Sequence, residues 1–97
     1  MSNIEKLQKL QSPAQAAQSI AKRERAARKQ RGFTQQQLSD RSGVPLGTLR
    51  RFEQTGQISF DALIRLARAL GCEADFDLLF TKPAYRSIQE VINEQAR

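Results

Sequence analysis

Apolar and polar positions follow a helical period over most of the first seventy residues. Between Pro13 and about Arg31, apolar residues recur every three or four positions and form a thin, continuous stripe. Ser12 precedes this stretch as an N-cap, and Pro13 occupies the first helical position, where its missing N–H costs nothing. Gly32 can adopt the left-handed conformation that ends a helix. The pattern therefore predicts a first helix over residues 13–31.

Three shorter helices follow, each marked by its own start or stop signal. Thr34 and Gln37 have the spacing of a capping box, in which each side chain bonds the backbone N–H of the other residue. Gly43 interrupts the helical pattern, and Ser59 is an N-cap ahead of a stretch with core spacing. Core positions are predicted at Leu49, Phe52, Phe60 and Leu63. The predicted helices cover residues 35–41, 45–54 and 60–70.

The period changes after Gly71, where the segment CEADFDLLF at 72–80 alternates roughly and is rich in Phe and Leu. This pattern predicts one short strand. A lone strand leaves its edges unpaired, and a copy of itself in a dimer would satisfy them most simply. We therefore expect a dimer in which Phe76, Leu78 and Phe80 make the contacts.

These elements divide the chain into three parts. Residues 1–11 form an N-terminal arm, residues 12–80 form one domain, and residues 81–97 form a tail or a short helix. Ninety-seven residues suffice for one compact domain and not for two. The predicted fold class is all-α, with four to five helices and the short C-terminal strand.

The charge distribution indicates a polyanionic partner. The formal net charge is +6, and it is uneven along the chain. Residues 1–58 hold eleven Lys or Arg against four acids, whereas residues 59–97 hold five against six. A basic part joined to a nearly neutral part suggests one surface that binds a polyanion.

The absence of histidine and the single cysteine, Cys72, exclude several kinds of chemistry. Zinc sites, His-based catalytic triads and Cys–His pairs all need residues that the chain lacks. We therefore expect no enzymatic activity, no cofactor and no metal. One cysteine fits a reducing compartment, and no apolar run is long enough for a membrane span or a signal peptide. The expected location is the cytoplasm, without membrane association.

The two helices joined by DRSGVP carry the strongest functional signal. A short connection that contains a glycine is typical of a helix-turn-helix. The second of these helices has two faces, because Leu49 and Phe52 point inward at a spacing of three. Its outward polar stripe consists of Gly47, Arg50, Arg51 and Gln54.

A helix of this girth fits the major groove of DNA, where residues near its N-terminus meet base edges. Gly47 lets the backbone come close to DNA, and Arg51 is placed to bind a guanine with two hydrogen bonds. Arg50 can do the same or bind a phosphate, and Leu46 offers an apolar contact for a thymine methyl. These four residues are the predicted base contacts.

With these motifs in place, residues 12–80 resemble the Xre, phage-repressor-like helix-turn-helix family. The family pattern combines an arginine late in the first helix with a glycine and a Thr-Gln pair, and continues through the turn into the recognition helix. Each element alone is weak, but together they cover about seventy residues and are specific. The matching residues are Arg28, Gly32, Phe33, Thr34, Gln35, Leu38, Gly43, Val44, Thr48, Leu49, Phe52 and Glu53.

The resemblance implies roles for particular residues. It implies that Gln35 binds a DNA phosphate at the start of the second helix, and that Leu46, Gly47 and Arg51 face bases. It also implies a buried ion pair between Arg28 and Glu53 that ties the first helix to the third. The predicted phosphate contacts are Thr34, Gln35, Thr48 and Gln54.

Three positions depart from the family pattern. Ser39 replaces a small alanine and still permits close helix approach. Pro45 stands where a polar N-cap of the recognition helix is usual, so that cap is weaker. Glu24 occupies a place that is usually apolar, where it either thins the core or pairs with a nearby arginine.

The leading functional hypothesis is a dimeric repressor that reads double-stranded operator DNA with helix 45–54. A narrower resemblance, to HipB-type antitoxins, rests on SPAQ at the start of the first helix and on the Phe/Leu strand. It implies a protein that binds a HipA-like kinase toxin and represses its own operon. The third hypothesis is nonspecific binding of nucleic acid or anionic membrane by the basic first helix.

Overall fold

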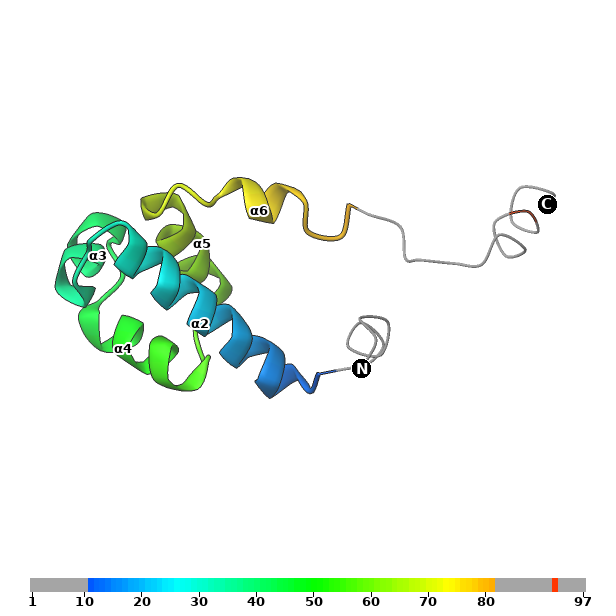
Figure 1. Ribbon diagram of the computed structural model, residues 1–97, viewed down its shortest axis with the longest axis horizontal. Coiled ribbons are helices and arrows are strands. Elements are labelled where there is room, and N and C mark those ends of the chain that lie inside the picture. The colour runs from blue at the N-terminus through cyan, green and yellow to red at the C-terminus, as the bar shows by residue number, and fades with distance from the viewer. Residues whose placement is uncertain (1–10, 82–91, 93–97) are drawn as a thin grey trace.

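The computed structural model describes residues 11–81 and residue 92. Within this part the chain is all-α, and α2 runs diagonally with α4 on one side and α5 and α6 on the other (Figure 1). The helix α2 packs against α4, and α3 packs against both α4 and α5. The helices are α2 (Pro13–Gln30), α3 (Gln35–Ser42), α4 (Leu46–Thr55), α5 (Phe60–Ala69) and α6 (Ala74–Asp77).

The helix starts follow from short-range hydrogen bonds. The Ser12 hydroxyl accepts from the backbone N–H of Gln15 at 3.1 Å, and the Gln15 side chain accepts from the backbone N–H of Ser12 at 3.0 Å. Thr34 and Gln37 form the same reciprocal box, at 3.1 and 2.9 Å. Because each box satisfies N–H groups that a helix end would otherwise leave unpaired, α2 and α3 begin where the capping residues predict.

The core lies where α2, α3, α4 and α5 meet. The most deeply buried large side chains come from α3, from α4, from the turn between them and from α5. Each of these helices is therefore held in place by packing against the others. Leu63 packs at the edge of this core, but the prediction for Phe60 was wrong, because that residue is 59% exposed. The central residues are Ala21, Leu38, Val44, Leu49, Phe52, Leu66 and Leu70.

The predicted strand over 72–80, and with it the pairing of strands in a dimer, is wrong. The segment contains α6 and a following turn, and the described residues contain no strand. Backbone N–H groups bond carbonyls three residues back, as Phe76 does to Glu73 at 3.0 Å, so they are not free to pair with a second strand. The Phe76 ring packs edge-on against Phe60, with 5.6 Å between the ring centroids.

The other two predicted contacts of that strand, Leu78 and Phe80, lie on the surface of the same segment. Phe80 is 96% exposed, and its backbone adopts a left-handed conformation with φ of 64°. The predicted arm over 1–11 and tail over 81–97 fall almost entirely outside the described residues. In the described part, no helix has the length and apolar character needed to cross a membrane.

Candidate nucleic-acid interface

A tight turn joins α3 to α4 and fixes the angle between them. Gly43 ends α3 in the left-handed conformation, with φ of 74°, which residues with a Cβ resist. The buried Ser39 hydroxyl donates to the Val44 carbonyl at 2.6 Å, and the Ser42 hydroxyl accepts from the Val44 backbone N–H at 3.1 Å. Ser39 thus ties α3 to the turn that leads into α4 by a hydrogen bond that the usual alanine would not supply.

The helix α4 separates an inward apolar face from an outward polar face. Leu49 and Phe52 are fully buried, as their spacing predicts. Pro45 provides no side-chain hydrogen bond to the start of the helix. On the other side, Gly47, Arg50, Arg51 and Gln54 are exposed, and Leu46 and Thr48 are partly buried.

The C-terminal end of α4 lies against the backbone of α2. Gly56 ends α4 in the left-handed conformation with φ of 80°. A Cβ at this position would lie 2.8 Å from backbone atoms of Ala17 and Gln18, closer than packing allows. Only glycine therefore permits both the turn and this close contact between the helices.

A buried ion pair fastens α4 to α2. The Arg28 guanidinium donates to both carboxylate oxygens of Glu53 at 2.9 Å, and the two side chains are 8% and 3% exposed. Arg28 also donates to the Phe33 carbonyl at 2.9 Å. The hydrogen bond to Glu53 raises the pKa of Arg28. The ion pair implied by the family resemblance is thus present, in two-point geometry.

The same carboxylate positions Gln35 at the start of α3. The Gln35 amide donates to Glu53 at 3.0 Å. Burial alone would raise the pKa of Glu53, but hydrogen bonds from Arg28, Glu24 and Gln35 and the charge of Arg28 lower it. An amide nitrogen carries two N–H groups, so Gln35 retains a donor for another acceptor. Thr34, the adjacent predicted phosphate contact, is exposed and caps α3.

Comparison with known families agrees with this geometry. The profile described as "HTH_3: Helix-turn-helix" matches residues 25–76, which is more than half of the chain. The chain belongs to this Xre-type helix-turn-helix family. Membership implies a DNA-binding domain of a transcriptional regulator, in a family that is typically non-catalytic. A comparison with curated proteins found no match.

In this HTH_3 domain, Arg51 has a partner that the sequence did not reveal. Its guanidinium donates to the side-chain oxygen of Gln57 at 2.5 Å. The Thr55 hydroxyl donates to the Arg51 carbonyl at 2.7 Å and accepts from the Gln57 backbone N–H at 3.1 Å. These bonds direct the Arg51 side chain toward the C-terminal end of α4. No motif marks Gln57, because its contact depends on the turn at Gly56.

Glu24 is the second residue whose role the HTH_3 pattern left open. It lies buried on α2 beside the Arg28–Glu53 pair, and its carboxyl oxygens accept no hydrogen bond from the described residues. Burial is the main cause that raises its pKa to about 8, and the hydrogen bond to Glu53 and the charge of Glu53 add to it. The charge of Arg28 acts in the opposite direction. At neutral pH the Glu24 carboxyl group therefore keeps its proton and donates it in the hydrogen bond to Glu53.

The remaining charged groups in the described part differ in the contacts that hold them or leave them free. No group of three or more Cys, Asp or Glu residues among residues 11–81 is arranged to hold a metal ion. The guanidinium of Arg41, near the end of α3, lies 4.5 Å from the centre of the Phe33 ring in a cation–π contact. Arg50 has no hydrogen bond or ion pair with another described side chain, so its guanidinium is available to a ligand.

Proposed function

We propose that this protein is a sequence-specific repressor that reads the major groove of DNA with α4. The observation that carries the proposal is the exposed stripe of Gly47, Arg50 and Arg51 on a helix whose opposite face is fully buried. A side chain can report base identity only when its support is rigid, and α4 is held by packing, by the turn at Gly43 and by the Arg28–Glu53 pair.

Base edges and phosphates are bound by different residues in this proposal. Arg51 binds guanine, Arg50 binds a base or phosphate, and Leu46 contacts a thymine methyl, with Gly47 leaving room for the backbone to approach. Phosphate contacts set the position of the domain and carry no sequence information. They are assigned to Thr34, Gln35, Thr48 and Gln54, which lie on α4 and around the start of α3.

The functional unit in this proposal is a dimer. Two recognition helices then read half-sites about 34 Å apart, or a multiple of that distance. The exposed apolar side chains of Leu78 and Phe80 support a contact between two copies without strand pairing, because such side chains on a soluble domain mark interaction surfaces. Repression follows from occupancy of a promoter by the dimer.

The test selects binding sites from a pool of random duplexes and then measures affinity for the selected and random sequences by fluorescence anisotropy. Arg51→Ala should weaken binding to the selected duplex by about 1–3 kcal/mol and relax the preference at one base pair. Arg68→Ala, which removes an exposed arginine from α5, is the control with the same change in net charge. Equal weakening on selected and random DNA would make Arg51 a phosphate contact.

An antitoxin role is the second candidate, with a HipA-like kinase as the partner. The strand that supported it is replaced by α6, and the apolar side chains of Leu78 and Phe80 now support a protein-binding surface. Capture of a kinase encoded beside this gene would favour this role, and deletion of residues 83–97 would test whether the tail is needed. Operator binding should survive that deletion.

A further inference from the structure

Gln57 lies outside α4, yet its side chain contacts the residue to which the proposed function assigns guanine recognition. The Arg51 guanidinium donates from Nη2 to the Gln57 side-chain oxygen at 2.5 Å, and both residues are exposed. An unrestrained arginine side chain samples many rotamers, so binding one base in one geometry carries an entropic cost. A hydrogen bond that is already present in the unbound domain removes part of that cost.

The backbone that carries Gln57 is held on both sides. Gly56 is buried, and a Cβ there would lie 2.8 Å from backbone atoms of α2. Ile58, on the other side, packs against the hydrophobic core. The Thr55 hydroxyl accepts from the Gln57 backbone N–H at 3.1 Å and donates to the Arg51 carbonyl at 2.7 Å. Gln57 is thus an exposed side chain on a fixed backbone.

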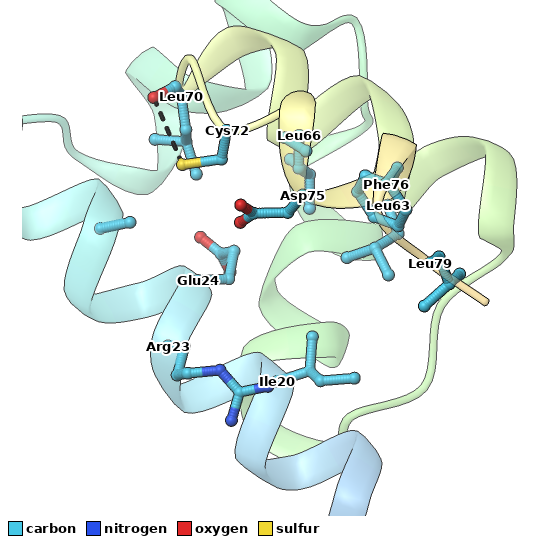
Figure 2. A pocket seen from close by; sticks show the side chains of 12 residues that line it. Ile20, Arg23, Glu24, Leu63, Leu66, Leu70, Cys72, Asp75, Phe76 and Leu79 are labelled. Carbon is cyan, nitrogen blue, oxygen red and sulfur yellow. Dashed lines mark hydrogen bonds between the residues drawn. The ribbon is translucent and has the colours of Figure 1, made fainter. Parts of the chain in front are cut away.

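A cavity between α2, α5 and α6 lies away from this turn. Its volume is about 270 Å³, and Figure 2 shows it between α2 and the segment that contains Phe76 and Leu79. Its lining comes from α2, from α5 and from residues that follow α5, with none from α4 or from residues 55–58. Side chains beside a void lack packing partners on one side. The turn that carries Gln57 does not border this space and is not loosened by it.

The contact leaves the two side chains with hydrogen-bond donors only. A guanidinium has five N–H groups in a planar fork, and Nη2 carries two of them. Whichever of these two bonds Gln57, one edge of the Arg51 fork keeps two parallel N–H groups. The Gln57 amide nitrogen keeps its donors, because only the oxygen is engaged. In the major groove guanine presents two acceptors, N7 and O6, whereas adenine presents a donor beside its acceptor. The free donors therefore suit guanine.

We propose that Gln57 is a specificity-determining residue that holds Arg51 in the orientation in which its free edge binds guanine. This inference rests on the proposed function, since it requires that α4 reads bases. Gln57 acts through Arg51 and is a positioning residue. Without it the guanidinium can turn to phosphates or other bases, so discrimination falls while the attraction to any duplex remains. The recognition surface then extends past α4 to the first residue after Gly56.

The experiment measures affinity by fluorescence anisotropy for the selected duplex and for three duplexes in which the base pair read by Arg51 is replaced. Gln57→Met keeps the length of the side chain but removes its oxygen. It should lower the preference for guanine about two- to tenfold, the range expected for one hydrogen bond. Its affinity for random DNA should change little, because no charge is removed.

Two further variants separate position from charge. Gln57→Glu keeps an acceptor for Arg51, so it should keep the preference for guanine while it weakens binding to every duplex, because its charge repels phosphates. Gln30→Ala changes an exposed glutamine in the last turn of α2, at the opposite end from the contact with Gly56. This control should change neither the preference nor the affinity.

A double-mutant comparison separates positioning from a direct contact. In the Arg51→Ala background, Gln57→Met should cause no further loss of preference, because no side chain remains to be positioned. A further loss there, at this base pair or a neighbouring one, would mean that Gln57 contacts DNA itself and would overturn the proposal. An unchanged preference in Gln57→Met alone, or an equal loss on selected and random duplexes, would overturn it too.

Failure of this inference can be told from failure of the proposed function. If Arg51→Ala leaves the preference unchanged, the assignment of guanine to Arg51 is wrong, and the inference falls with it. If Arg51→Ala removes the preference and Gln57→Met does not lower it, only the inference is wrong. Urea unfolding of Gln57→Met should have the midpoint of the original protein, so that a lost preference is not a loss of folding.

Discussion

Replacement of Glu24 by glutamine should stabilise the protein at neutral pH, and the gain should depend on pH. In the folded chain the pKa of Glu24 is raised from 4.5 to about 8, mainly by burial and also by Glu53. Between these two values the unfolded chain loses the proton while the folded chain keeps it. The stability that this proton provides is complete below pH 4.5 and is lost as the pH rises through 8.

The magnitude follows from this difference. Each pH unit between 4.5 and 8 lowers the free energy of unfolding by about 1.4 kcal/mol for a single group. At pH 7 the loss is therefore about 3–3.5 kcal/mol, a large share of the stability of a small domain. Glutamine cannot ionise, has nearly the same volume and can donate to Glu53 as the protonated acid does. Glu24→Gln should thus match the original protein near pH 4.5 and exceed it by about 3–3.5 kcal/mol at pH 7.

The assay is urea unfolding followed by circular dichroism at pH 4.5, 6, 7 and 8. Asp61→Asn serves as the control, because Asp61 is an exposed partner of Arg65 and its removal should leave the pH dependence in place. The pKa of Glu53 is lowered, so the stability that Glu53 contributes is lost as the pH falls. This pH dependence is opposite to that of Glu24, so the two can be told apart. An unchanged slope between pH 5 and 8 in Glu24→Gln would refute the reasoning.

Further predictions concern the supports of α4. Glu53→Ala removes the partner of buried Arg28, and urea unfolding should show a loss of about 3–5 kcal/mol; a loss near zero would contradict the ion pair's role. Gly56→Ala should lower the melting temperature more than Gly32→Ala, since both residues have positive φ but only position 56 meets backbone; equal shifts would count against the close contact. Gly47→Ala should add about 0.5–1 kcal/mol of stability while weakening DNA binding by anisotropy. Gln57→Ala should reduce preference for the selected duplex more than affinity for random DNA.

The sequence predicted α2 to α5 and the faces of α4 because their determinants are local. Ser12, Thr34 and Ser59 cap helices through bonds to residues three positions away, and the turn glycine at 43 requires no tertiary information. The exposed stripe on α4 likewise follows from the helical period. The pairing of Arg28 with Glu53 spans twenty-five residues. Its prediction came from resemblance to a family and not from spacing.

The errors and omissions have a common physical cause, because each depends on contacts between distant elements. The segment 72–80 alternates weakly, and the packing of Phe76 on Phe60 favours a short helix over a strand. Phe60 is the first residue of α5 and lies at an exposed end of that helix, which periodicity alone did not reveal. In the sequence, Glu24 could be recognised only as an acidic residue on an otherwise apolar stripe. Its neighbour Glu53 comes from α4, so their contact depends on the packing of two helices. The contact of Gln57 with Arg51 depends on the chain reversal at Gly56.

The open space over Gly47 means that folding does not restrict the side chain at this position, which is left to the proposed contact with DNA. A Cβ there would meet no atom within 4 Å outside its own turn of helix, and the neighbouring Arg50 and Arg51 side chains are exposed. If α4 reads bases as proposed, substitutions at these positions should change which duplexes are recognised with little effect on folding. After a gene duplication, two copies could acquire different operators through a few such exchanges and keep the same scaffold.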